Sequence, residues 1–375
     1  MVSTFIIDHI PSIIVQQVNM ARLLSLYFPI LIFVGLLHGQ MRLVSSEPHV
    51  PCYFIFGDSL VDSGNNNILN TTAKVNYLPY GIDFPEGPTG RFTNGRTAAD
   101  IIGQFLGFVK FIPPYVNATD QEISTGVNYG SGGAGIREES GRHLGDRISF
   151  PRQLLNHVTT ISRISALHGN KTFTAEYLKK CIYLANIGSN DYVSNYFIPT
   201  LYSTSNIYTV DKYAVVLAEQ YREQLTKLYN LGARKIVVFG LSQLGCIPAA
   251  IAAIGTNGKP CVDSINDAAN LFNNRLKPLV DELNNDHFDA KFTFINLTSI
   301  LAPEGDVPTS NVHCCLTQPG QCIPNSIPCP VRGLSTFYDD LHPTEVVNTV
   351  VATRSYIALS NMDASPYDIS HLARL

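Results

Sequence analysis

The chain has 375 residues, of which 45% are hydrophobic and only 15% are charged, against about 25% charged residues in a typical domain. Its 26 basic and 30 acidic residues give a net charge of −4, which excludes the basic surface of a nucleic-acid-binding protein. The composition also excludes an intrinsically disordered chain, and the length is sufficient for a complete hydrophobic core.

The first feature along the chain is an uncharged apolar run at residues 23–37. This run is shorter than the roughly 20 residues that a membrane-spanning helix needs, and Arg22 precedes it. A positive flank, an apolar segment and small residues before Glu47 are typical of a signal peptide that is cleaved at that point. An uncleaved membrane anchor is the alternative interpretation.

Residues 1–19 are mixed in character and do not resemble the charged start of a signal peptide, whereas Met20 and Arg22 do. We therefore interpret residues 1–46 as a signal-peptide region with an N-terminal extension, and Met20 as an alternative start of translation. Residues 47–375 are expected to form a single secreted domain with no stable membrane anchor.

Short apolar runs alternate with segments of helical spacing through the rest of the chain. Strands are predicted at residues 53–56, 126–129, 182–187, 235–239 and 292–295. Helices are predicted at residues 96–106, 150–167, 211–231, 262–283 and 344–359. This alternation predicts a parallel sheet covered by helices, with its functional groups at the carboxyl ends of the strands.

Eight cysteines are typical of a protein from an oxidising compartment. Four of them lie between residues 314 and 329, in a stretch rich in Pro and Gly that predicts a disulfide-linked loop. The chain has no CxxC pair, so a zinc site is not expected. Four sequons predict glycosylation of a secreted chain, at Asn70, Asn117, Asn170 and Asn296.

Ser59 is the first candidate for chemistry. It follows the apolar run at residues 53–56, and a hydroxyl at a strand end is exposed and close to backbone N–H groups, as a nucleophile requires. The surrounding sequence is not the G-x-S-x-G turn, because Val61 stands where the second glycine would be. A helix-capping serine is the alternative interpretation.

A nucleophilic serine needs a base, and His342 is the best placed of the histidines. Asp339 precedes it by three residues, so that its carboxylate can reach Nδ1–H while Nε2 faces the nucleophile. The alternative is a purely structural start of the helix predicted at residues 344–359.

The third requirement is a set of donors for a developing oxyanion. Asn190 can offer its side-chain amide, Ser59 its own backbone N–H, and the loop at residues 132–135 a glycine N–H that no Cβ shields. Phosphate binding by this loop is not expected, because the Gly-Lys-Ser/Thr sequence and the dinucleotide spacing are both absent.

Four blocks now occur in order along the chain, and together they resemble the GDSL esterase/lipase family, in particular its plant branch within the SGNH hydrolase superfamily. The blocks are Phe-Gly-Asp-Ser-Leu-Val-Asp-Ser-Gly-Asn-Asn-Asn (56–67), Gly-Val-Asn-Tyr-Gly-Ser-Gly-Gly-Ala-Gly-Ile (126–136), Ile-Gly-Ser-Asn-Asp-Tyr (187–192) and Asp-Asp-Leu-His-Pro-Thr-Glu (339–345). Residues 91–96 and 241–248 are similar to that branch too.

The resemblance implies a flavodoxin-like three-layer α/β/α sandwich with a five-stranded parallel sheet over one hydrolase domain. It implies Ser59 as nucleophile, His342 as base and Asp339 as its partner, although Asp340 stays open as that partner. Ser59, Asn190 and Gly133, with Gly132 as the alternative glycine, would form the oxyanion hole. The chain departs from the family at Tyr338, where Trp is frequent, and at Gly130, where Ala is usual.

The expected function is a secreted serine ester hydrolase that cleaves carboxylic esters of lipids or acylated polysaccharides through an acyl-serine intermediate. Two alternatives stay open, an acyltransferase that uses the same acyl-enzyme and a catalytically silent extracellular binding protein. No cofactor, metal or nucleic acid is expected, and a plant protein would lie in the cell wall or apoplast. The implied strand order brings Cys52 and Cys181 together as a disulfide, and Cys246 and Cys261 are a second plausible pair.

Overall fold

The computed structural model describes residues 47–302 and 312–375, and the residues from Pro48 onward form one compact unit. The predicted signal-peptide region at residues 1–46 and the alternative start at Met20 lie outside the described residues. Within the described part of the chain, no helix is both long enough and apolar enough to cross a membrane.

A mostly parallel sheet lies at the centre of the fold, as predicted. Its strand order is β1 (Tyr53–Gly57), β2 (Ile182–Asn186), β3 (Lys235–Phe239), β4 (Lys291–Ile295) and β5 (Ala364–Ser365). The first four strands are parallel, and only β5 is antiparallel to its neighbour β4. The five predicted strand segments all pair in parallel, and β5 is a further two-residue strand that the sequence did not indicate.

The segment predicted as a strand at residues 126–129 runs along the free edge of β1 without forming a full strand. It makes one parallel bridge to β1, between Ile55 and Asn128, and Ile55 donates its N–H to the Val127 carbonyl at 3.0 Å. The pairing is short because the chain turns directly after Tyr129 into a glycine-rich loop. With this segment counted as the second strand, the order is the flavodoxin-like 2-1-3-4-5.

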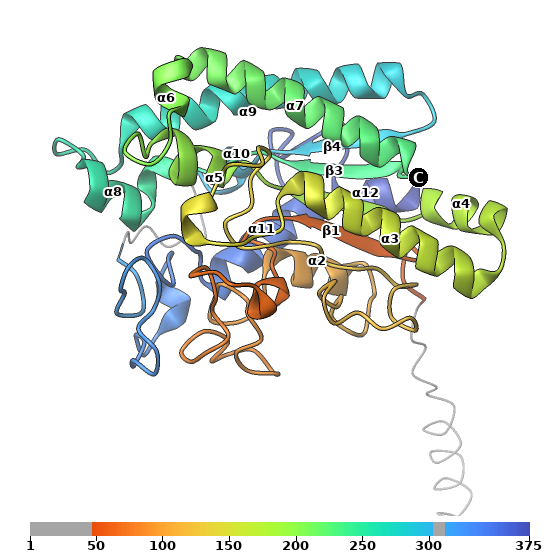
Figure 1. The fold of residues 1–375 in the computed structure, drawn as a ribbon, viewed down its shortest axis with the longest axis horizontal. Coiled ribbons are helices and arrows are strands. Elements are labelled where there is room, and N and C mark those ends of the chain that lie inside the picture. Colours follow the sequence, from red (N-terminus) through yellow and green to blue (C-terminus); the bar gives the residue numbers. More distant parts are fainter. Residues whose placement is uncertain (1–46, 303–311) are drawn as a thin grey trace, which may run out of the picture. The chain divides into compact units, whose positions relative to one another are not determined.

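Helices cover both faces of the sheet and give the three predicted layers (Figure 1). One face packs against α3 (Phe150–His168), α7 (Val210–Asn230) and α9 (Asp263–Asp286). The other packs against α2 (Ala98–Phe105), α11 (Glu345–Tyr356) and α12 (Ile369–Arg374). Along β1, Phe54 and Phe56 join the first core and Tyr53 and Ile55 the second, because successive strand residues point to opposite faces.

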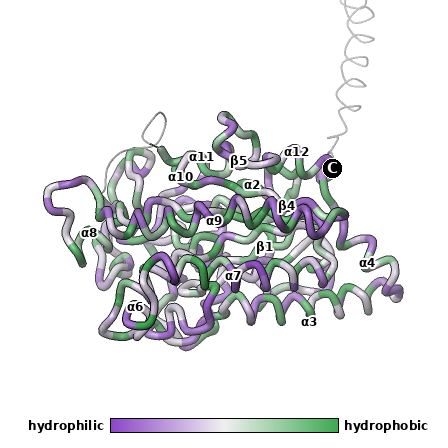
Figure 2. The backbone as a smooth tube through the Cα atoms, turned by 90° about the horizontal axis from the view of Figure 1, so that it is seen from above, coloured by the Kyte–Doolittle hydropathy of each residue, from purple (hydrophilic) through white to green (hydrophobic). Residues whose placement is uncertain are grey.

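The five predicted helices are confirmed with end points shifted by a few residues. α7 and α9 are amphipathic, and in Figure 2 their tubes alternate between hydrophobic and hydrophilic residues. The shorter elements complete the described chain. They are η1 (Asn65–Ile68), η2 (Arg142–Leu144), α4 (Lys171–Lys179), α5 (Ser189–Asp191), η3 (Tyr192–Tyr196), α6 (Thr204–Ile207), η4 (Leu244–Cys246), α8 (Pro248–Ile254), α10 (Leu297–Ile300) and η5 (Arg332–Leu334).

All eight cysteines form disulfides, and both predicted pairs are confirmed. Cys52 and Cys181 precede the neighbouring strands β1 and β2, with their Cα atoms 4.7 Å apart. The other pairs are Cys246–Cys261, Cys314–Cys329 and Cys315–Cys322. The last two close the cysteine-rich loop on itself, and this loop packs against residues 73–92 in a small separate core.

Candidate active site

The carboxyl ends of the four parallel strands meet at a single cavity of about 400 Å³. Each strand is followed by a residue that lines it: Ser59 after β1, Asn190 after β2, Leu244 after β3 and Leu297 after β4. His342 enters the same cavity from the loop before α11. The candidate catalytic side chains of this fold therefore lie mainly on the loops that follow the parallel strands.

The end of β1 is held rigidly just before Ser59. The buried side chain of Gln153, on α3, accepts the N–H of Gly57 at 2.9 Å and donates to its carbonyl at 2.7 Å. Gly57 must be glycine because a Cβ there would lie 2.2 Å from the backbone oxygen of Asn186 on β2. The position of the Ser59 backbone is thus fixed by two neighbouring elements.

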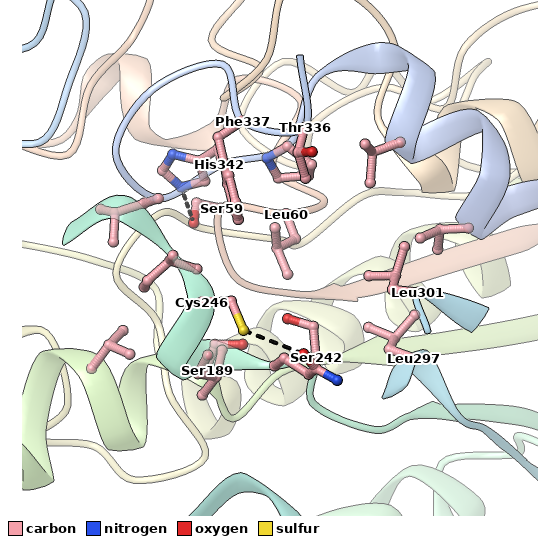
Figure 3. Close-up of a pocket in the computed structure, with 18 of the residues that line it drawn as sticks. Ser59, Leu60, Ser189, Ser242, Cys246, Leu297, Leu301, Thr336, Phe337 and His342 are labelled. Atoms are coloured by element: carbon pink, nitrogen blue, oxygen red, sulfur yellow. Dashed lines mark hydrogen bonds between the residues drawn. The ribbon is translucent and has the colours of Figure 1, made fainter. Parts of the chain in front are cut away.

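Ser59, His342 and Asp339 are joined by hydrogen bonds across 283 positions of sequence. His342 Nε2 lies 2.8 Å from Ser59 Oγ (Figure 3). On the other side of the ring, His342 Nδ1 lies 2.9 Å and 2.8 Å from the two carboxylate oxygens of Asp339. A hydroxyl, an imidazole and a carboxylate in this order are the arrangement that activates a serine.

Asp339 is buried and has every carboxylate oxygen engaged. Oδ1 accepts the backbone N–H groups of Leu341 at 2.8 Å and His342 at 2.7 Å, and Oδ2 accepts the phenolic O–H of Tyr80 at 2.6 Å. Asp340, the alternative partner of the histidine, instead accepts the hydroxyl of Thr317 and lies beside His313. The structure thus places Asp339, and not Asp340, against His342.

Tyr80 contacts Asp339 and Phe92 contacts His342, so both side chains help to hold the histidine and its carboxylate partner in place. The Tyr80 oxygen accepts the backbone N–H of Cys322 at 3.0 Å, which links it to the cysteine-rich loop. The ring of Phe92 lies 4.8 Å from the imidazole of His342. Tyr338, where the family frequently has Trp, donates to the Pro79 carbonyl and packs against Tyr80, but it does not line the cavity.

The predicted oxyanion donors differ in how far their N–H groups are free to donate. One side-chain N–H of Asn190 donates to the Ala134 carbonyl at 3.0 Å, so a second N–H is left to donate elsewhere. Within the described residues, the backbone N–H groups of Ser59 and Gly133 have no hydrogen-bond acceptor. The N–H of Gly132 is occupied by Asp62, which disfavours this glycine as a donor. Gly133 itself does not line the cavity. Its neighbour Ala134 accepts the hydrogen bond from Asn190, which does line the cavity.

Two buried carboxylates hold the loops that carry these donors. Asp62 accepts the N–H groups of Gly64 and Asn65, both at 2.7 Å, as well as that of Gly132. Asp191 accepts the N–H of Ile136 at 2.8 Å and the hydroxyl of Ser140 at 2.7 Å. Both residues therefore have the structural role that loop aspartates usually have.

Asp58, the neighbour of Ser59, accepts fewer hydrogen bonds than Asp62, Asp191 or Asp339. Its Oδ1 accepts the N–H of Leu60 at 3.0 Å, but its Oδ2 is buried with no partner among the described residues. Burial raises the pKa of Asp58 to about 7, against the opposing effects of the Leu60 hydrogen bond and the nearby His342. Burial also raises the pKa of Asp62 and that of Asp191 to about 6.

This burial predicts that Asp58→Asn stabilises the protein at neutral pH relative to acidic pH. Between about pH 4 and pH 7 the folded Asp58 keeps a proton that the unfolded chain releases, so stability falls as the pH rises, by roughly 1.4 kcal/mol per pH unit, and the loss levels off above pH 7. Asparagine keeps the Leu60 hydrogen bond but does not titrate. Urea unfolding of both proteins from pH 4 to pH 8 should give a free-energy difference that grows across this window, and a difference independent of pH would contradict the prediction.

The predicted glycosylation sites lie at the surface with one exception. Asn70, Asn117 and Asn170 are exposed, whereas Asn296 is half-buried at the start of α10. Asn296 there accepts the N–H of Ser299 through its side-chain oxygen. The first three positions are therefore more accessible to a glycosylating enzyme than the fourth.

Sequence reasoning missed the residues that support the site from a distance. Gln153 and Tyr80 act across 96 and 259 positions of sequence, and neither stands in a motif that names its partner. Only Phe92 had a signal, because it belongs to the block at residues 91–96. The aliphatic residues of the cavity wall were not predicted either, since they come from five separate elements.

The chain is similar to known proteins over most of its length. A family model described as GDSL-like lipase/acylhydrolase matches residues 53–354. Two GDSL esterase/lipases of Arabidopsis thaliana are 49% and 48% identical to the chain, covering 88% and 91% of it and 93% and 96% of their own lengths. A third is 45% identical over 95% of this chain and 100% of its own. Among solved structures, phospholipase A1 from Streptomyces albidoflavus NA297 matches at 14% identity with a TM-score of 0.38, covering 82% of this chain and 99% of that one, a likeness too low to argue from.

Proposed function

The chain belongs to the GDSL-like lipase/acylhydrolase family and is a carboxylic ester hydrolase, and from this premise we propose that it works through an acyl-serine intermediate formed on Ser59. The observation that carries the proposal is the 2.8 Å contact between Ser59 Oγ and His342 Nε2, in a ring whose other nitrogen faces Asp339. A serine in this setting can lose its proton as it attacks.

In the first half of the reaction, Ser59 Oγ attacks the ester carbonyl carbon while His342 Nε2 takes the serine proton. Asp339 holds Nδ1–H and stabilises the imidazolium that forms. The carbonyl oxygen becomes an oxyanion, which the N–H groups of Ser59, Gly133 and Asn190 stabilise. The carbon–oxygen bond to the alcohol then breaks, and the alcohol leaves with the proton from Nε2.

In the second half, water replaces the alcohol. His342 Nε2 takes a proton from the water as its oxygen attacks the acyl carbon, and the same three N–H groups stabilise the second oxyanion. The bond to Ser59 Oγ breaks, the serine regains its proton from the imidazolium, and the carboxylic acid leaves. One ester and one water thus give one acid and one alcohol, and the enzyme returns to its starting state.

We also propose that the protein is secreted and acts on extracellular esters of lipids or acylated polysaccharides. The four disulfides support an oxidising compartment, and three of the four sequon asparagines are exposed. The similar proteins are from a plant, so the plant cell wall or apoplast is the proposed location. Mass spectrometry of the protein released by producing cells should find a mature chain that begins near Glu47.

Active-site labelling tests the acyl-serine mechanism directly. A fluorophosphonate probe should modify the folded protein at one position, and peptide mapping should place the adduct on Ser59, because only a serine with an adjacent base reacts at a useful rate. The heat-unfolded protein is the control and should not react. A folded protein that stays unlabelled, or that is labelled elsewhere, would favour a catalytically silent binding protein.

A further inference from the structure

Residues 246–261 form a disulfide-closed segment beside the opening of the active-site cavity. Cys246 and Cys261 bridge its two ends, and both line the cavity together with Ile247 and Pro260. Pro260 is exposed, so the cavity opens to solvent beside this segment. The segment carries α8, which Figure 1 places at the end of the molecule where the carboxyl ends of the strands lie.

The composition of α8 is unusual for a helix at the surface. Residues 247–255, which include the whole helix, carry no polar side chain. Ala252, Ala253 and Ile254 are nevertheless exposed, Ile254 at 50%. A surface helix normally has polar residues on its outer face, and a helix that is apolar on every side is normally buried in protein or in lipid. The outer face of α8 therefore lacks the side chains that suit a helix to water.

A further exposed apolar side chain, Leu316 of the cysteine-rich loop, lies close to α8. Both segments contact Asp340, because Ala249 of α8 donates its backbone N–H to the Asp340 carbonyl at 2.9 Å and Thr317 donates its hydroxyl to the Asp340 carboxylate at 3.0 Å. Leu316 is 64% exposed, and Leu341, which follows Asp340, lines the cavity. These exposed apolar residues flank the opening of the cavity, and we call them the mouth surface: Ala252, Ala253, Ile254 and Leu316.

The charge of the two segments indicates which partner the mouth surface fits. Only Lys259 is charged in residues 246–261, and it pairs with Asp263. Only Arg332 is charged in residues 312–334, and it pairs with Asp83. Anionic lipids are recognised by clusters of Lys and Arg, which neither segment has, so the surface matches an uncharged lipid. A lipid can also supply ester to the opening that it covers, whereas a protein partner or a second copy would only cover it.

We propose that the mouth surface docks on an uncharged lipid phase made of water-insoluble esters, and that α8 enters the outer layer of that phase. The inference rests on the proposed function, because Ser59 must act on the ester that the lipid supplies, and it selects lipid esters over acylated polysaccharides as the substrate. Docking buries apolar side chains that water otherwise surrounds, and the strength of binding scales with the apolar area buried.

The chain has no tryptophan, which gives a direct measurement of docking. In Ile254→Trp the single indole reports on α8 alone, and its emission should shift to shorter wavelength when the protein is mixed with phosphatidylcholine vesicles that contain triolein. Phe288→Trp is the matched control, because Phe288 is 86% exposed but precedes β4, at the opposite end of the strands. Its emission should not shift. No shift in Ile254→Trp, or an equal shift in both variants, would overturn the proposal.

Charged substitutions test whether docking serves catalysis. Ile254→Asp combined with Leu316→Asp should lower both the affinity for these vesicles and the hydrolysis of their triolein at least about tenfold. Neither residue lines the cavity, so kcat/KM for dissolved p-nitrophenyl butyrate should stay unchanged, which also shows that the variant is folded. Phe288→Asp should change none of these quantities. Undiminished hydrolysis of triolein by the folded double variant would contradict the proposal.

The other possible partners give different results. Emission of Ile254→Trp that shifts with protein concentration in the absence of lipid would mean that a second copy covers the surface, and the inference would be wrong. Tighter binding to phosphatidylglycerol vesicles than to phosphatidylcholine vesicles would assign the surface to anionic lipid and would also overturn it. A lipid-dependent shift in a protein that hydrolyses no ester would contradict the proposed function and not the docking.

Discussion

Ser59→Ala is expected to lower kcat for p-nitrophenyl butyrate at least about 10⁴-fold, the largest effect of any single substitution in this protein. The alanine removes the atom that attacks the carbonyl, and His342 then has no proton to accept. Activity that remains should come only from water attacking in a site whose oxyanion donors are still present. Steady-state hydrolysis with purified protein measures this loss.

The fold should survive this substitution. Ser59 is only half-buried, and its hydroxyl contacts a single side chain, that of His342. The melting temperature should therefore stay within about 2 °C of that of the unmodified protein, since exposed substitutions change stability by about 0.5 kcal/mol or less. Ser162→Ala, on the exposed face of α3, is the matched control and should keep full activity. Ordinary turnover by a folded Ser59→Ala protein would remove the basis of the mechanism.

The centre of the fold could be predicted from the sequence because its signals are local. The run Lys235–Phe239 is apolar, rich in β-branched residues and bounded by glycines, and this combination favours a short buried strand over a helix. The chemistry was predictable for a related reason. Asp339 and His342 are three residues apart, so their contact depends on a single turn of chain. The meeting of His342 with Ser59 was implied by the resemblance of the sequence blocks, because His342 follows no strand and comes from the loop before α11.

The parts that were missed depend on contacts between distant segments. β5 has only two residues and pairs with β4 because the chain returns to that edge after α11, which no local pattern of Ala364 and Ser365 indicates. The hydrogen bond from Tyr80 to Asp339 joins a loop after η1 to a loop before α11. Such pairs require the whole fold before either partner can be recognised.

Asp339→Asn is the second prediction with a very large effect, and we expect it to lower kcat roughly 10³- to 10⁴-fold although the side chain keeps its size. The reason is the fixed set of donors around the carboxylate. Oδ1 receives two backbone N–H groups, from Leu341 and His342, so the one oxygen of an asparagine will be held at that position. The asparagine NH₂ group must then occupy the position of Oδ2, which lies 2.8 Å from His342 Nδ1.

An NH₂ group at that position donates to Nδ1, and the imidazole is forced to carry its proton on Nε2. Nε2 then donates to Ser59 Oγ and cannot accept the serine proton, so the nucleophile is not activated although all three residues remain in place. Tyr80→Phe separates this effect from a simple loss of support, because it removes one donor to Asp339 and leaves the tautomer unchanged. We expect that variant to lose only about tenfold in kcat.

Asp340→Asn completes the test as the matched control, because Asp340 lies next in sequence but contacts Thr317 and His313. It should retain at least half of the activity. Equal losses from Asp339→Asn and Asp340→Asn would mean that neither carboxylate orients His342 specifically. A small loss from Asp339→Asn with a large loss from Tyr80→Phe would instead mean that the contact between Tyr80 and Asp339 matters for packing alone. Only the asparagine moves the proton of the His342 ring from Nδ1 to Nε2.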